Sequence, residues 1–192
     1  MTTPPTSFPT DLTLFAEGLK LSRPTANDVD LLVDACQDPD IVRFTHVPSP
    51  YTTEHAQDYV AICEQGARSG QSLGLLARDE SGRMLASCGL VSVDWTDRAA
   101  EVGYWVAPWA RQSKVATRAT RAVCQFAFES AGIQRLTLKA AAVNVASNRV
   151  AQRAGFTHEG TLRMAMADRS TRQEGGTRFD VNIWGLLPEE QR

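Results

Sequence analysis

The sequence predicts a mixed α/β fold, with one mostly antiparallel central sheet flanked by helices. Strand-like runs joined by turn residues in the middle of the chain indicate consecutive antiparallel strands. Apolar residues at helical spacing before and after these runs indicate helices, and glycines and prolines separate the segments. The predicted order is strand, two helices, three strands, helix, strand, helix and two strands. This order differs from the regular strand–helix alternation of a doubly wound sheet.

The first part of the chain is expected to form a strand and two helices. The alternating run GLKLSRPT ends at Pro24 and predicts the opening strand. Thr25 is suited to cap the following helix. The segment QDPDIVRFTHVPSPYTT is rich in turn residues and is expected to be irregular, and residues 53–68 are expected to be helical. Apolar residues recur at helical spacing in the first helix: Val29, Leu32, Val33 and Cys36.

The remainder is expected to alternate between strands and helices. QSLGLLARD and RMLASCGLVSVDW predict a hairpin closed by a Glu-Ser-Gly turn, and AEVGYWVA predicts a third strand. Residues 114–130 are expected to form a helix that ends before Gly132, with a buried stripe of Val115, Ala119, Ala122, Val123 and Phe126. QRLTLKAAAV predicts a strand, and SNRVAQRA a short helix closed by Gly155. The last two strands are expected near residues 156–162 and 178–187.

Length and composition indicate a single globular domain over residues 15–192, preceded by a flexible tail over residues 1–14. The 192 residues are 43% hydrophobic and 22% charged. No signal sequence and no apolar stretch long enough to span a membrane is found. The cysteines, Cys36, Cys63, Cys88 and Cys124, are irregularly spaced, which indicates free thiols and a cytoplasmic location. Neither they nor the three histidines have metal-ligand spacing, so no metal is expected.

Charge is distributed unevenly along the chain. Residues 102–158 contain eight basic residues and one acid, whereas residues 24–64 contain eight acids and one arginine. This asymmetry favours a polyanionic ligand on the second half and a cationic one near the first. For any single residue, a solvated helix face is the alternative. The pI of about 5.9 and the lack of a basic stripe interleaved with aromatic residues argue against nucleic acid.

The turn in YWVAPWARQSKVATRA is the strongest candidate for a ligand site. The chain passes from an apolar strand through Pro108 into a segment that holds Arg111, Lys114 and Arg118 and no acid. The N-terminus of a helix presents unpaired N–H groups and a partial positive charge. The turn therefore predicts that a phosphate group is held here.

The run EVGYWVAPWARQSKVATRA, followed by NVASNRVAQRAGF and HEGTLR, resembles the GNAT superfamily of N-acetyltransferases. Within it, these motifs resemble the ribosomal-protein-alanine acetyltransferase (RimJ/RimL-like) branch. The resemblance covers about residues 15–187. It implies an acyl-CoA N-acyltransferase fold and an enzyme that moves an acetyl group from acetyl-CoA to a primary amine, without a metal, in a ternary complex. The acceptor would be a protein N-terminal α-amine or a small-molecule amine.

Two alternatives to acetyl transfer stay open on the sequence. One is transfer of a larger acyl group such as succinyl, and the other is an acyl-CoA-binding sensor without turnover. No membrane or nucleic-acid partner is expected, and exposed apolar edges would allow a homodimer.

The resemblance assigns the pyrophosphate of the cofactor to a loop of the form (Q/R)-x-x-G-x-(G/A). Lys114 stands where the family has its first glycine. If this position is helical, lysine costs little and adds a cation; if it needs a positive φ, the loop must shift. The helical case is expected. The pantetheine arm would be held by the amides of Trp105 and Val106. The residues that match the loop are Arg111, Gln112, Ser113, Lys114, Val115 and Ala116.

The resemblance also suggests the residues that carry the chemistry. Glu101, at the start of the strand, is the expected base for the amine. The superfamily tyrosine that donates to the thiolate is replaced by Ala151, and Ser147 is the expected donor instead. Ser147 could equally be only the N-cap of its helix. Asn144 is expected to bind the cofactor arm or to bridge the splayed strands, and Asp180 is a secondary candidate for amine recognition.

Overall fold

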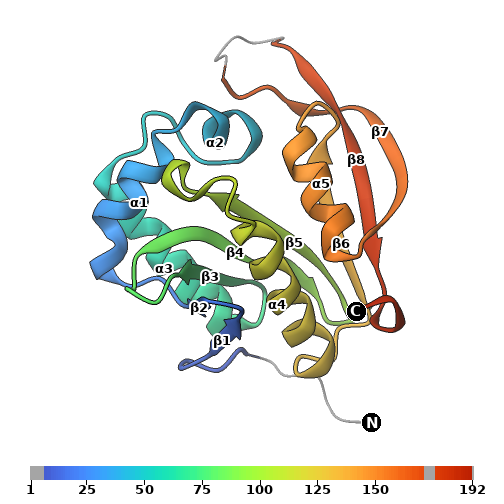
Figure 1. The fold of residues 1–192 in the computed structure, drawn as a ribbon, viewed down its shortest axis with the longest axis horizontal. Coiled ribbons are helices and arrows are strands. Elements are labelled where there is room, and N and C mark those ends of the chain that lie inside the picture. The colour runs from blue at the N-terminus through green and yellow to red at the C-terminus, as the bar shows by residue number, and fades with distance from the viewer. Residues whose placement is uncertain (1–6, 171–175, 192) are drawn as a thin grey trace.

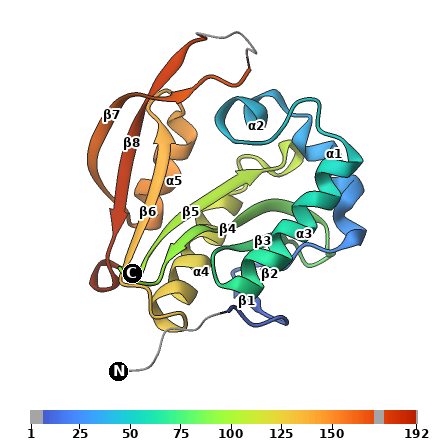
Figure 2. The same cartoon turned by 180° about the vertical axis from the view of Figure 1, so that it is seen from behind.

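The computed structural model describes residues 7–170 and 176–191, which form one eight-stranded sheet with helices on both faces (Figure 1). The strand order is β1-β2-β3-β4-β5-β6-β8-β7. Neighbouring strands are antiparallel except β5 and β6, which are parallel. The reverse view in Figure 2 shows α1 and α3 on the face opposite α4 and α5. The predicted mixed α/β class is confirmed.

The elements follow the predicted order with two additions, β1 and α2. Their bounds are β1 (Thr13–Ala16), β2 (Leu19–Ser22), η1 (Ala26–Asp28), α1 (Val29–Cys36), α2 (Pro39–Phe44), α3 (Thr53–Ser69), β3 (Leu73–Arg78), β4 (Met84–Asp94), β5 (Ala99–Val106), η2 (Pro108–Ala110), α4 (Val115–Glu129), β6 (Arg135–Ala141), α5 (Val145–Ala154), β7 (Thr157–Ala167), β8 (Arg178–Leu186) and η3 (Pro188–Glu190).

The helix α2 lies where an irregular segment was predicted, so that prediction was wrong. Asp38 is its N-cap, and its Oδ1 accepts from the N–H groups of Asp40 (3.0 Å) and Ile41 (3.1 Å). Pro39 occupies the first helical position, where its missing N–H costs nothing. The same Asp-Pro pair that indicated a turn therefore starts a helix.

The packed chain also begins earlier than residue 15. Phe8 is buried, and its N–H donates to the carbonyl of Ala67 at 2.7 Å. β1 then begins at Thr13 and pairs with β2. Phe8 thus fixes the start of the described chain in the core, although Pro9, Thr10 and Asp11 after it are exposed.

The core lies between the sheet and the helices on its two faces. The meander β3-β4-β5 was predicted from strand-like runs joined by turn residues. Leu75 and Leu76 point to opposite faces of β3, and both are buried because helices cover both faces of the sheet. On α4, the predicted stripe is buried at Val115 and Val123. This packing fixes the two structures that bound the site, the C-terminal half of β5 and the N-terminus of α4.

Candidate active site at the divergence of β5 and β6

The parallel strands β5 and β6 pair only over their first halves. The ladder between β5 (Ala99–Val106) and β6 begins at the pair Ala99 and Arg135. It ends at the pair Val102 and Leu138. Beyond these residues β5 continues to Val106 and β6 to Ala141, and no pairing joins them in the described chain. The inner backbone groups of both strands are therefore open to a ligand that can pair as a strand does.

The ladder between β4 and β5 shows which amides face this gap. The N–H of Ala107 donates to Leu85 on β4 at 2.9 Å. Because antiparallel pairs alternate, Trp105 also directs its N–H to β4, whereas Tyr104 and Val106 direct theirs to the β6 side. Of the two predicted amides, that of Val106 faces the gap and that of Trp105 does not.

The segment of residues 111–116, hereafter the RQSKVA loop, leads from η2 into α4. Lys114 is the N-cap of α4 and has φ 60°, and Gln112 has φ 63°. The expected helical conformation of Lys114 is wrong, because the chain turns from η2 into α4 through two left-handed residues. A side chain in this conformation costs about 1–2 kcal/mol. The position is thus one where glycine would be favoured.

The N-terminus of α4 retains the features of an anion site. Lys114 makes no side-chain hydrogen bond that caps the helix. The amides of Val115 and Ala116 lie in the first turn, where helical N–H groups lack partners within the helix. The hydroxyl of Ser113 donates to Ala110 O at 2.6 Å and so steadies the loop. These amides suit a phosphate group.

Two arginines near the loop already have partners. The guanidinium of Arg111 pairs with the Asp38 carboxylate and lies 3.6 Å from Asp40. Arg118 donates to the carbonyls of Glu17 and Ser113. Arg111 thus ties the loop to the N-terminus of α2, and Arg118 ties it to the turn between β1 and β2.

The expected base, Glu101, pairs with a lysine from the facing strand. Nζ of Lys139 lies 2.7 Å from Oε2 of Glu101. The carboxyl side chain is 28% exposed, so solvent reaches it. Glu101 alternates with Val102, whose buried side chain packs in the core, and it therefore points to the opposite face of the sheet.

A second hydroxyl accompanies Ser147. Oη of Tyr104 lies 2.7 Å from Oγ of Ser147 and 3.3 Å from its carbonyl oxygen. Asn144 is the N-cap of α5, and its Oδ1 accepts from the N–H of Ser147 at 3.0 Å. Ser147 is therefore not the cap of this helix, since Asn144 has that role. Tyr104 was missed because its sequence position gives no sign of this contact.

The strand-bridging role expected of Asn144 belongs to Asn148. Its Nδ2 donates to Ala141 O at 2.9 Å, which links α5 to the end of β6. Its Oδ1 accepts from Asn182 (2.8 Å) and Trp184 (3.1 Å) of β8. These bonds hold α5, β6 and β8 together on one side of the gap.

A polar cluster lies between α2 and the end of β7. Arg43 pairs with Asp168 at 3.1 Å, and Arg169 Nη2 lies 2.7 Å from His46 Nε2. Burial and then the Arg169 guanidinium lower the pKa of His46, against an opposing influence of Glu101. The imidazole is thus neutral near pH 7 and accepts from Arg169.

Asp180 lies apart from this chemistry. Its Oδ1 accepts from the N–H of Met164 at 2.8 Å. Met164 has φ 51° and lies in an irregular part of the β7–β8 ladder. Asp180 therefore supports the backbone of β7.

The cysteines do not form a nucleophilic site. All four are buried, and burial raises the pKa of the Cys36 and Cys88 thiols to about 12. Within residues 7–170 and 176–191, no group of side chains is arranged to hold a metal ion. None of the helices described there is long and apolar enough to cross a membrane.

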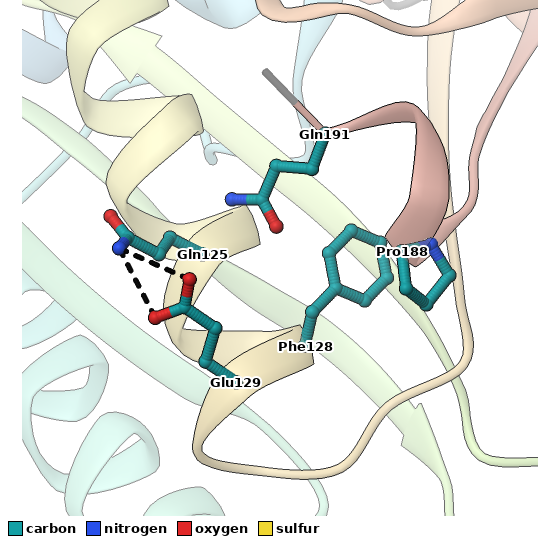
Figure 3. A pocket seen from close by; sticks show the side chains of 5 residues that line it. All are labelled: Gln125, Phe128, Glu129, Pro188 and Gln191. Carbon is teal, nitrogen blue, oxygen red and sulfur yellow. Dashed lines mark hydrogen bonds between the residues drawn. The ribbon is translucent and has the colours of Figure 1, made fainter.

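A shallow hollow lies at the other end of α4, as Figure 3 shows. It is lined by Gln125, Phe128 and Glu129 of α4 and by Pro188 and Gln191 near the C-terminus. Gln125 and Glu129 bond to each other there. The RQSKVA loop precedes α4, so this hollow is separated from the site by the length of the helix.

The divergent strands and the open helix N-terminus are the features expected of an acyltransferase. The acetyltransferase (GNAT) domain family matches residues 19–157, and this chain belongs to that family. It is similar to the N-acetyltransferase p20 of Bacillus licheniformis, with 24% identity over 181 residues, 93% of this chain and 97% of the relative.

Solved structures share the fold. Mycobacterium smegmatis RimJ in complex with CoA-disulfide superposes with a TM-score of 0.78 at 18% identity, over 93% of this chain and 87% of that one. Spermidine N-acetyltransferase from Vibrio cholerae, in complex with CoA and spermine, superposes with a TM-score of 0.74 at 16% identity. The match covers 90% of this chain and 97% of that one. Identities this low establish the fold alone.

Proposed function

We propose that this chain transfers an acetyl group from acetyl-CoA to a primary amine by direct attack within a ternary complex. The observation that carries the proposal is the gap between β5 and β6 next to the open N-terminus of α4. The gap suits the amide-bearing pantetheine arm, and the helix N-terminus suits the pyrophosphate. CoA is bound by the similar RimJ and spermidine acetyltransferase structures.

Each residue near the gap has a role in this proposal. The amides of Val115 and Ala116 hold phosphate oxygens, and the Val106 N–H pairs with the cofactor arm or the acetyl oxygen. Glu101 accepts the proton from the attacking amine, directly or through water. The raised thiol pKa values exclude the described cysteines as ready nucleophiles, which favours direct transfer.

The acceptor is a primary amine of a protein N-terminus or of a small molecule. The exposed acidic residues of α1, Asp30 and Asp34, are suited to a cationic acceptor. Two structures similar in fold name the two acceptor classes: RimL, a ribosomal L7/L12 alpha-N-protein acetyltransferase, and spermidine N-acetyltransferase.

Thermal unfolding with saturating acetyl-CoA tests the cofactor half of the proposal. At about 100 times Kd, binding adds about 2.7 kcal/mol, which raises Tm by about 5–10 °C in a chain of this size. Adenosine is the control and is expected to leave Tm unchanged. An unchanged Tm with acetyl-CoA would contradict the proposal.

Mass spectrometry then tests the acceptor half. The protein is incubated with acetyl-CoA and either peptides with free N-terminal amines or spermidine. Acetylation of one set identifies the acceptor class. Binding of acetyl-CoA without acetylation of any amine would favour a sensor, and faster transfer from succinyl-CoA would favour the larger acyl group.

A further inference from the structure

The hydroxyls of Tyr104 and Ser147 meet across the gap between β5 and β6. Tyr104 lies two residues beyond Val102, the last residue of β5 that pairs with β6. Ser147 lies in the first turn of α5, the helix that follows β6. Their oxygens are 2.7 Å apart. The contact therefore joins the two sides of the site where the backbone ladder has ended.

Contacts outside the gap fix the positions of Ser147 and Tyr104. The Asn144 cap fixes the backbone of Ser147. Tyr104 is opposite Cys88 on β4, and the Cys88 thiol lies 3.9 Å from Thr120 of α4. Tyr104 consequently packs on the face of the sheet that α4 covers, and its hydroxyl position is set by the core.

The chemistry of the two hydroxyls determines what they can do. Burial raises the pKa of Tyr104 far above its usual range, so the phenol keeps its proton. A thiol, with a pKa of about 8.5, is a stronger acid than this phenol or a serine. Neither hydroxyl would therefore hand its proton to a thiolate, but each has one proton with which to donate a hydrogen bond.

We propose that Tyr104 is a positioning residue for acetyl transfer, which rests on the function proposed above. In this arrangement its hydroxyl donates to Ser147 Oγ, the nearer of its two possible acceptors (2.7 Å, against 3.3 Å for the Ser147 carbonyl oxygen), which leaves the serine proton free to donate to the sulfur of acetyl-CoA. As the amine nitrogen bonds to the acetyl carbon, the carbon–sulfur bond breaks and its electron pair goes to sulfur. The amine proton goes to Glu101 and then to solvent, and CoA leaves as a thiolate hydrogen-bonded to Ser147.

This arrangement accounts for the loss of the superfamily tyrosine at Ala151. Hydrogen bonds in series polarise one another, so a serine that accepts from Tyr104 is a better donor than a serine alone. Tyr104 supplies the first hydroxyl of the series from β5, and Ser147 directs the second hydroxyl, its own, to the gap. Ser147 thus stabilises the leaving group as a donor without acting as an acid.

Kinetics of Tyr104→Phe, Ser147→Ala and the double variant test the arrangement. We expect Tyr104→Phe to lower kcat about tenfold, in line with the loss of a hydrogen bond to a charged centre. The double variant should be no slower than Ser147→Ala, because Tyr104 acts through the serine. Multiplicative losses, or an unchanged kcat in Tyr104→Phe, would overturn the proposal.

The chain offers a matched control in Tyr59→Phe. Oη of Tyr59 lies 2.8 Å from Oγ of Ser87, a similar hydroxyl pair between α3 and β4. Its loss should lower stability about as much as the loss of the Tyr104 hydroxyl, and kcat should not change. Equal falls in kcat for the two variants would show a general effect of stability and contradict positioning.

A second measurement does not depend on turnover. The thiol of bound CoA is titrated by the ultraviolet absorption of its thiolate, with desulfo-CoA as the blank. Tyr104→Phe is expected to raise the thiol pKa by about one unit relative to the wild type, a tenfold change, and Tyr59→Phe to leave it unchanged. Equal thiol pKa values in wild type and Tyr104→Phe would overturn the proposal even if kcat falls.

The two proposals can fail separately. If Tyr104→Phe raises the thiol pKa and the wild type acetylates no amine, the proposed function fails and the role of Tyr104 on the sulfur stands. If the wild type acetylates an amine and the thiol pKa does not respond, only the role of Tyr104 fails. Absence of CoA binding would overturn both.

Discussion

Lys139 and Glu101 form an ion pair between the two strands that diverge, with Nζ 2.7 Å from Oε2. Lys139 follows Leu138, the last residue of β6 that pairs with β5. The lysine therefore holds the carboxylate at the mouth of the gap while its other oxygen, Oε1, has no partner among the described residues. A cation at this place also disfavours a second ammonium group beside it, so the acceptor is favoured as the neutral amine.

Glu101→Gln is expected to lower kcat by about 10²–10⁴-fold, because the amide cannot accept the amine proton. Tm should change little, since the residue is partly exposed and the pair it loses lies near solvent. Steady-state kinetics and thermal unfolding measure the two effects. Glu159→Gln is the control, because Glu159 forms a similar half-exposed pair with Arg135. A comparable kcat in Glu101→Gln and wild type would remove Glu101 from the mechanism.

Lys114→Gly is expected to stabilise the protein by about 0.5–1 kcal/mol. Glycine removes the cost of the left-handed conformation, and part of this gain is offset by the greater entropy of the unfolded chain. Denaturant unfolding gives the difference. Lys114→Ala keeps a Cβ and should not be stabilised, whereas Gln112→Gly, also at positive φ, should change in the same direction as Lys114→Gly. Equal stability of the alanine and glycine variants at position 114 would refute the strain argument.

Asp38→Asn is expected to strengthen CoA binding a few-fold at low salt. The asparagine still caps α2, but it no longer neutralises Arg111. The guanidinium then keeps only the more distant Asp40 as an acidic partner and attracts the pyrophosphate more strongly. Isothermal titration at two salt concentrations measures the effect. Asp40→Asn should give a smaller change, because Asp40 is more distant from Arg111 (3.6 Å) and more exposed. Weaker CoA binding by Asp38→Asn would show that Arg111 acts from its paired position.

Asp28→Asn is expected to lower the free energy of unfolding at pH 7 by about 3 kcal/mol. The buried carboxylate accepts two hydrogen bonds from Arg78, at 2.7 and 2.9 Å, and the substitution leaves that guanidinium without its counter-charge. Burial opposes ionisation of Asp28, but the bonds from Arg78 and Thr25 outweigh it and lower the pKa.

The pH dependence of this pair follows from that direction. A carboxyl group whose pKa is lowered on folding contributes its full stability above its pKa in the unfolded state, about 3.9. This contribution is lost as the pH falls through its pKa in the folded state. The difference between wild type and Asp28→Asn should therefore be constant from pH 7 to 5 and decrease below about pH 4. Urea unfolding across this range measures it. A constant difference at every pH would mean that the loss arises from packing and not from charge.

Local patterns in the sequence predicted most of the fold. Strand-like runs joined by turn residues identified the β3-β4-β5 meander, and the stripe that includes Val115 and Val123 identified α4. The helix α2 was missed because Asp-Pro begins a turn as readily as a helix, and the choice depends on whether later residues, here Ile41 and Val42, are buried.

The site was predicted less completely. Motif order placed Glu101 and the RQSKVA loop, but the positive φ of Lys114 depends on how η2 meets α4, and no residue type specifies that. The contact between Tyr104 and Ser147 joins residues that are distant in sequence, so it exists only once β5 and α5 are packed. The register with β4, which turns the Val106 amide and not that of Trp105 toward the gap, is likewise a property of the whole sheet.

The early end of the β5–β6 ladder makes the sheet of the free protein incomplete. Among the residues that the structure describes, the peptide groups of Tyr104, Val106 and Lys139 face this gap without the backbone partners that other central strands provide. An arm with amide groups of its own supplies those partners when it enters. Cofactor binding would in that sense be the final step of folding, and the protein would be most resistant to unfolding when its substrate is plentiful.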